Sequence, residues 1–173
     1  MTLAWWPAAL IWALASGGVV DPLPAATGAR ARVLLFVNID CPISNRYAPE
    51  LNRLHEQFSR EGVRFWLVYP DASQTTAQAR AHAHAYGLAM PILRDPELQL
   101  VRRAKTIVTP EAAVFDAAGQ LVYHGRIDDR FADFGVQRPQ PTARNLQDAL
   151  AAVLEGRRVN TPTTTAIGCF VPR

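Results

Sequence analysis

The chain has 173 residues, of which 49% are hydrophobic and 19% are charged, and its formal net charge is +3. This composition is typical of one globular domain whose core is large enough to fold without disulfide bonds. Basic and acidic residues are interleaved and Lys105 is the only lysine. The charge pattern therefore indicates no nucleic-acid partner.

The N-terminus is apolar, and residues 1–15 carry no charged side chain. The stretch from Leu3 to Ala15 is shorter than the roughly 20 residues of a membrane span, and small residues near Ala15 fit a cleavage site. We expect residues 1–15 to be a signal peptide; an N-terminal membrane anchor or a buried or disordered extension is the alternative. Residues 16–31, rich in proline and glycine, read as a linker. A signal peptide predicts export to the periplasm or beyond, where disulfides persist.

Hydrophobic periodicity then predicts alternating strands and helices. Strands are expected at 33–39, 63–69, 90–93, 112–115 and 121–126, and helices at 43–60, 73–86, 95–105 and 142–155. Pro49 should kink the first helix, and Ser73 should cap the second. Residues 127–142 are expected to form a loop, and an extended tail should follow Gly156. Parallel strands followed by a hairpin give an α/β fold, with a mixed central sheet and helices on both faces.

Cys41 lies where the first strand meets the first helix. Strand ends of this kind meet ligands at the carboxyl edge of an α/β sheet, and a helix N-terminus favours the thiolate, which is the reactive form of cysteine. The neighbouring Asp40 should raise the pKa of the thiol, and Arg46 could offset it. The residues alone therefore predict either a nucleophilic thiol or a buried, unreactive one.

These features resemble the thioredoxin superfamily, and within it the redoxins related to alkyl hydroperoxide reductase and thiol-specific antioxidant proteins. The resemblance covers residues 32–156. It rests on Cys41-Pro42-Ile43-Ser44 at the strand–helix turn, on Pro49 eight residues later, on Thr109-Pro110 before a strand, and on the hairpin and final helix. Thioredoxins carry a second cysteine where this chain has Ser44. The stretch 36–40 lacks the proline and threonine of peroxiredoxin sites.

The resemblance implies roles for several residues. Cys41 would be the nucleophile, and a cis Thr109–Pro110 bond would present backbone to a substrate strand. Pro42 and Ser44 would support the site, Ser44 either by donating to the thiolate or by capping the helix.

Two further features outside the turn have open roles. Cys169 could resolve an oxidised Cys41, because the 13 residues from Gly156 to Cys169 span about 40 Å when extended. It could equally be a static clip, an intermolecular link or a metal ligand. Arg126 begins a charge cluster completed by Asp128, Asp129 and Arg130, which is either a solvated loop held by ion pairs or an element near Cys41 that recognises a substrate or tunes the pKa of the thiol.

The leading functional hypothesis is a thiol-based oxidoreductase without a cofactor. Its substrates would be protein thiols and disulfides or small peroxides, with an external thiol as reductant. The alternative is a copper chaperone or sensor that uses Cys41, Cys169 and a histidine such as His124, since soft thiolates select Cu(I). A third hypothesis is a redox-inactive interaction domain.

Overall fold

A five-stranded mixed sheet forms the centre of the molecule, in a computed structural model that describes residues 12–13, 19–23 and 28–172. Its strand order is β5-β4-β3-β7-β8, with β3 parallel to β4, β4 parallel to β5, and β7 antiparallel to both β3 and β8. The strands are β3 (Ala31–Phe36), β4 (Val63–Tyr69), β5 (Ile92–Arg94), β7 (Glu111–Asp116) and β8 (Leu121–Gly125).

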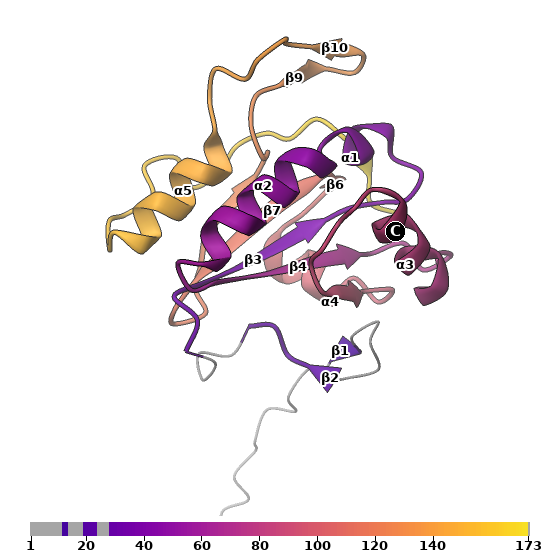
Figure 1. Cartoon of the computed structure of the whole chain (residues 1–173), viewed down its shortest axis with the longest axis horizontal. Helices are drawn as coiled ribbons and strands as arrows, with labels where there is room; N and C mark the ends of the chain where they lie inside the picture. The colour runs from indigo at the N-terminus through magenta and orange to yellow at the C-terminus, as the bar shows by residue number, and fades with distance from the viewer. Residues whose placement is uncertain (1–11, 14–18, 24–27, 173) are drawn as a thin grey trace, which may run out of the picture.

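Helices cover both faces of this sheet. They are α1 (Pro42–Arg46), α2 (Ala48–Ser59), α3 (Thr76–Ala85), α4 (Gln99–Ala104) and α5 (Asn145–Leu154). Alternate residues of β3 belong to two different hydrophobic clusters, one on each face of the sheet, because successive side chains of a strand point to opposite faces. Val33 and Leu35 pack with residues of α2, α3 and α5, whereas Leu34 and Phe36 pack with residues of α4. Figure 1 shows α2 and α5 lying over the sheet.

The helix predicted at 43–60 is two helices, so the expectation of one kinked helix is wrong. The helical hydrogen-bonding pattern breaks at Tyr47, between α1 and α2. Pro49 lies in the first turn of α2, where the missing N–H of proline removes no helical hydrogen bond. The break leaves Cys41 at the start of a separate, five-residue helix.

The next two helices begin later than predicted, because other side chains satisfy their first N–H groups. Thr75, not Ser73, caps α3 in a capping box with Gln78. The carboxylate of Asp95 accepts hydrogen bonds from the N–H groups of Gln99 and Val101, so α4 begins at Gln99. Both helices therefore have polar side chains that accept from their first N–H groups, Thr75 for α3 and Asp95 for α4.

The segment predicted as a loop at 127–142 contains a small antiparallel hairpin. Its strands are β9 (Phe131–Asp133) and β10 (Val136–Gln137). Helix α5 begins at Asn145 rather than Thr142. The carboxylate of Asp129 accepts hydrogen bonds from the N–H groups of Thr142 and Ala143, at 2.7 and 2.9 Å, and thereby fixes the approach to α5.

Most of the predicted signal peptide lies outside the described residues. A two-residue pair, β1 (Trp12–Ala13) with β2 (Val19–Val20), is antiparallel. Within the predicted linker, Leu23 is buried in the same cluster as α4, so this part of the chain packs on the domain. Among the described residues, no helix has the length and apolar character needed to cross a bilayer.

The C-terminal tail returns across the molecule to the α1 end of the sheet (Figure 1, yellow). Thr163 bridges His124 of β8 in parallel, and the N–H of His124 donates to the carbonyl of Pro162 at 3.0 Å. The tail ends in β11 (Cys169–Phe170), which is antiparallel to β6 (Val108–Thr109). The tail is therefore an ordered edge of the fold, held at two places.

Candidate active site

Cys41 is the N-cap residue of α1 and follows directly on the turn after β3. Its backbone is extended and Pro42 occupies the first turn of the helix, which suits the fixed φ of proline. The side chain is buried, with 1% of its surface exposed. The Cys41 thiol donates to the carbonyl oxygen of Thr109 at 3.1 Å. The predicted turn thus holds the sulfur inside the protein, facing β6.

The pKa of the Cys41 thiol lies below its ordinary value. Burial acts to raise this pKa, but hydrogen bonds from the Cys169 thiol and from the backbone N–H and hydroxyl of Ser44 outweigh it. Ser44 is itself buried, and its hydroxyl makes no hydrogen bond within the described chain while Cys41 is a thiol. The hydroxyl is therefore free to donate once the sulfur ionises, which favours the thiolate. Of the two roles expected for Ser44, its position favours the first, donation to the sulfur.

Cys169 lies beside Cys41 because β11 is in register with β6. Cys169 faces Thr109 in the register, the Thr109 hydroxyl donates to the Cys169 carbonyl at 3.4 Å, and the N–H of Val171 donates to the carbonyl of Ile107 at 3.0 Å. Burial, together with the hydrogen bond to Cys41, raises the pKa of Cys169 to about 12. Both cysteines are free thiols, Cys41 buried and Cys169 half-buried. Cys41 is therefore the more acidic of the two thiols.

Thr109 and Pro110 form the surface against which both sulfurs lie. The peptide bond between them is cis, as predicted. The Thr109 carbonyl oxygen accepts a hydrogen bond from the Cys41 thiol, and Thr109 is also the β-partner of Cys169. Thr109, whose backbone was predicted to face a substrate strand, thus pairs instead with the tail of the same chain.

Glu111 supports this surface and was not recognised in the sequence. Its buried carboxylate accepts hydrogen bonds from the N–H groups of Ile107 and Val108, at 3.0 and 3.4 Å. Burial raises the pKa of Glu111. The available signal was a carboxylate at the start of an otherwise apolar strand, where a charge needs buried partners.

His124 is held away from the two cysteines. Its ring lies 3.6 Å from the Glu111 carboxylate and its Nε2 lies 3.3 Å from the Thr163 hydroxyl. In the part of the chain that the structure describes, no cluster of three or more metal-binding side chains occurs. Cys41, Cys169 and His124 therefore do not form the copper site of the alternative hypothesis.

The charge cluster after β8 is structural and does not reach the sulfur. Arg126 donates through Nε to the side chain of Asn145 at 2.7 Å and through its N–H to the hydroxyl of Thr164 at 3.0 Å. Asp128 and Asp129 are buried, and the Tyr47 hydroxyl donates to Asp128 at 2.6 Å. The ion pairs of the first alternative are present, since Arg130 lies 3.9 Å from Asp128, but both carboxylates are buried rather than solvated. Arg126 binds the tail and α5.

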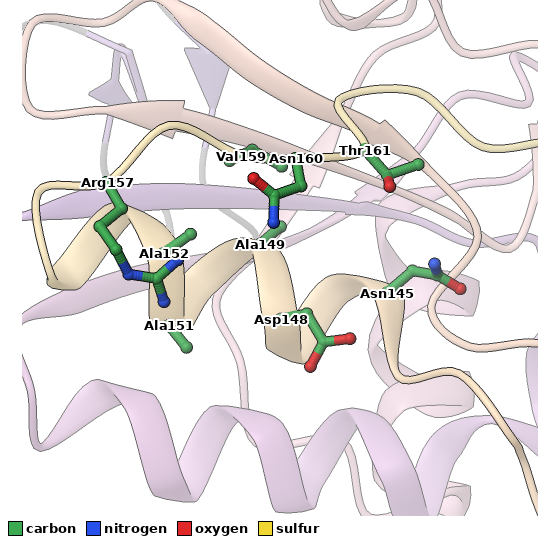
Figure 2. A pocket seen from close by; sticks show the side chains of 9 residues that line it. All are labelled: Asn145, Asp148, Ala149, Ala151, Ala152, Arg157, Val159, Asn160 and Thr161. Carbon is green, nitrogen blue, oxygen red and sulfur yellow. The ribbon is translucent and has the colours of Figure 1, made fainter.

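Among the hollows that border the tail, two differ in the character of their lining. One, of about 380 Å³, lies between α5 and the first tail residues, where Asp148 and Arg157 face it (Figure 2). The other, of about 650 Å³, lies between α4 and β11 and includes Phe170, the neighbour of Cys169. Phe170 is 78% exposed and Ile107 60% exposed. The second hollow is therefore lined largely by apolar side chains, and one of them, Phe170, follows Cys169 in the chain.

Comparisons with known proteins agree with this architecture. The model of the AhpC/TSA family matches residues 22–124. No curated protein matches the chain in sequence. A hypothetical protein from Sinorhizobium meliloti 1021 has a similar structure, with a TM-score of 0.79 and 24% identity over 99% of this chain and 94% of that one.

Two other solved structures extend the comparison. An uncharacterized conserved protein from Geobacillus kaustophilus has a TM-score of 0.77 at 27% identity, over 95% of this chain and 89% of that one. A secreted Mycobacterium tuberculosis disulfide oxidoreductase homologous to E. coli DsbE has a TM-score of 0.56 at 19% identity, over 86% and 96% of the two chains. The predicted thioredoxin-like α/β fold is confirmed.

Proposed function

Because the chain belongs to the AhpC/TSA family, we propose that it is a thiol-based oxidoreductase with Cys41 and Cys169 as its redox-active pair. The observation that carries this proposal is that both cysteines meet at Thr109, whose carbonyl oxygen accepts a hydrogen bond from the Cys41 thiol at 3.1 Å and which is the β-partner of Cys169. The more acidic thiol is the one that ionises and reacts first, and an internal disulfide forms when the second sulfur attacks the first after its oxidation.

The reaction begins with attack by the Cys41 thiolate. On a disulfide substrate, the Cys41 sulfur joins one substrate sulfur and the other leaves as a thiolate. On a peroxide, it takes one oxygen to become a sulfenic acid and the remaining oxygen leaves as hydroxide or alcohol. In either case Cys169 then loses its proton and attacks the Cys41 sulfur, closing a Cys41–Cys169 disulfide and releasing a thiol or water. An external thiol reductant restores the pair.

The substrates are protein disulfides or small peroxides, and no cofactor takes part in these steps. The place of action we propose is outside the cytoplasm, supported by the apolar N-terminus and by the similarity to a secreted disulfide oxidoreductase. An exported protein can keep an internal disulfide in its oxidised state.

Burial of Cys41 is the observation that favours the redox-inactive interaction domain. That hypothesis also requires a raised pKa, because an inert buried thiol stays protonated. Here the Ser44 donors and the Cys169 thiol hold the pKa of Cys41 below its ordinary value. The oxidoreductase is therefore the function that the site supports best.

Turnover by cysteine variants tests the proposal. Wild-type protein should reduce insulin disulfides or hydrogen peroxide with dithiothreitol as reductant, and Cys41→Ser should have no activity above that of dithiothreitol alone. A stopped-flow measurement of Cys41 oxidation separates the substrates, because a peroxidase must react with peroxide faster than a free thiol does. Equal activity of Cys41→Ser and wild type would refute the proposal.

A further inference from the structure

A chain of hydrogen bonds joins β4 and α3 to the turn that carries Cys41. We infer that His82, in the middle of this chain, is a positioning residue: acting through Asn45, it holds the sulfur of Cys41 within reach of its hydrogen-bond donors. This inference rests on the proposed function, because the position of the sulfur matters to catalysis only if the sulfur reacts. The role of His82 is geometric and includes no proton transfer.

Both ring nitrogens of His82 are hydrogen-bonded, and the side chain is buried. Nδ1 lies 2.8 Å from the hydroxyl of Tyr69, the last residue of β4, and Nε2 lies 2.8 Å from the side-chain oxygen of Asn45 in α1. The amide nitrogen of Asn45 donates in turn to the carbonyl of Ile39 at 3.1 Å. Figure 1 shows α1 and α3 at the same end of the sheet. The chain thus connects a strand and two helices to the residue two positions before Cys41.

The surroundings of His82 keep its ring neutral. Burial lowers the pKa of His82, and the charge of Asp40 in the turn, which acts to raise that pKa, is the smaller effect. Among the described residues, the other titratable groups against the ring are Tyr69 from β4 and Tyr86 at the end of α3, whose ring centre lies 4.8 Å away. Burial raises the pKa of Tyr69, so its hydroxyl keeps the proton that it donates.

The direction of each bond follows from the last acceptor of the chain. The carbonyl oxygen of Ile39 can only accept, so the nitrogen of the Asn45 amide faces it and the oxygen faces His82. That oxygen also only accepts, so Nε2 of His82 carries a proton. A neutral imidazole has one N–H group, which leaves Nδ1 to accept from the hydroxyl of Tyr69. A single tautomer of His82 therefore satisfies the whole chain.

Asn45 transmits this arrangement to both sides of Cys41. Its side chain holds the carbonyl of Ile39 before the cysteine, and its backbone N–H donates to the carbonyl of Cys41 itself at 3.1 Å. The residue before Asn45 in α1 is Ser44, whose N–H and hydroxyl favour the ionised sulfur against the effect of burial. A rotated Asn45 amide would open the turn, and the sulfur would move relative to these donors.

Two substitutions at residue 82 separate the two halves of the chain. The longer glutamine side chain places its amide near the position of Nε2, whereas asparagine places its amide near the position of Nδ1. His82→Gln therefore keeps a donor to Asn45. His82→Asn keeps a partner for Tyr69 and leaves Asn45 without its donor. His84→Asn, at an exposed position of the same helix, is the matched control.

The rate of Cys41 alkylation by iodoacetamide is then measured against pH in the reduced protein. The midpoint of this profile reports the ionisation of the sulfur, and its plateau reports access to it. We expect His82→Asn to move the midpoint to higher pH, so that the rate at neutral pH, as a fraction of the plateau, falls several-fold. His82→Gln and His84→Asn should stay close to wild type. An unchanged midpoint in His82→Asn, or equal shifts in the asparagine and glutamine variants, would overturn the inference.

A measurement on the wild-type protein tests the chain without a substitution at residue 82. NMR correlation of the ring protons with the ring nitrogens shows which nitrogen carries the proton, and the signals of His82 are those absent from His82→Gln. We expect the neutral Nε2–H form at neutral pH. The Nδ1–H form, or a cationic ring, would overturn the inference. Neither measurement involves turnover, so failure of the proposed function is seen separately, as inactivity of wild type toward insulin disulfides and hydrogen peroxide.

Discussion

The α-carbon of Gly168 lies against the carbonyl group of Thr109, so closely that a side chain at residue 168 would overlap it. A Cβ atom built on Gly168 would stand 2.3 Å from the Thr109 oxygen and 2.7 Å from its carbonyl carbon. Both neighbours are backbone atoms and cannot rotate away. Glycine at this position is what allows β11 to pair with β6 and bring Cys169 to Cys41.

Gly168→Ala should therefore detach the end of the tail. We expect faster alkylation of Cys41 by iodoacetamide, because the sulfur loses its cover, and slower formation of the internal disulfide, because Cys169 is no longer held beside it. Thr165→Ala, at an exposed tail position, is the matched control and should behave as wild type. Wild-type alkylation rates in Gly168→Ala would show that the tail does not cover Cys41 in solution.

Ser44→Ala should raise the pKa of Cys41. The variant removes the buried hydroxyl that is free to donate to the Cys41 thiolate, and a hydrogen bond to a charged group favours the charged form. The measurement is the alkylation rate of Cys41 against pH, whose midpoint should move to higher pH. Ser44→Thr keeps a hydroxyl, and its profile should stay closer to that of wild type. A midpoint unchanged in Ser44→Ala would refute the role of this hydroxyl.

Cys169→Ser should stop the reaction after the first step, at the mixed disulfide between Cys41 and the substrate. The Cys41 thiolate still attacks a disulfide substrate, but serine cannot displace the substrate from the Cys41 sulfur, so a mixed disulfide accumulates. Non-reducing mass spectrometry after incubation with oxidised glutathione should find glutathione on Cys41 in this variant and an internal disulfide in wild type. If wild type also stops at the mixed disulfide, Cys169 has no resolving role.

Asp129→Asn should remove part of the acid sensitivity of the fold. Hydrogen bonds from the Thr142 side chain and from the N–H groups of Ala143 and Thr142 lower the pKa of Asp129 from 3.8 to about 2. A carboxyl group with a lowered folded-state pKa stabilises the protein above its unfolded-state pKa, and this contribution is lost as the pH falls through the folded-state value.

Urea unfolding between pH 2 and 6 measures this contribution. Wild type should lose stability between about pH 4 and about pH 2, and the variant, less stable by about 1 kcal/mol at neutral pH, should lose less over the same interval. Parallel stability curves for the two proteins would contradict the assignment.

The local part of the site was predictable from sequence, because it depends on residues close together in the chain. An apolar strand, then Cys41 and Pro42, then a helical pattern places the sulfur at a strand–helix turn without knowledge of the rest. The Thr109–Pro110 bond was predictable through the family resemblance. Donation from Ser44 to the sulfur was one of the two roles expected for it, and its burial was not expected.

The long-range part was not predictable. The pairing of Cys169 with Thr109 depends on a close approach that only Gly168 permits, and a single glycine in a tail fits a turn or a flexible segment equally well. Glu111 organises residues 107 and 108 through backbone N–H groups that no sequence pattern marks. The charge of Arg126 left open whether it lies near Cys41 or in a solvated loop, and its partners are Asn145 and Thr164.

The most direct measurement is peptide mass spectrometry of the protein after mild oxidation with one equivalent of hydrogen peroxide or of oxidised glutathione, with free thiols blocked before digestion. We predict a single linked peptide pair containing Cys41 and Cys169 within one chain, at a protein concentration too low for intermolecular disulfides. Both cysteines found blocked and unlinked, or Cys169 linked only to a second molecule, would contradict the account.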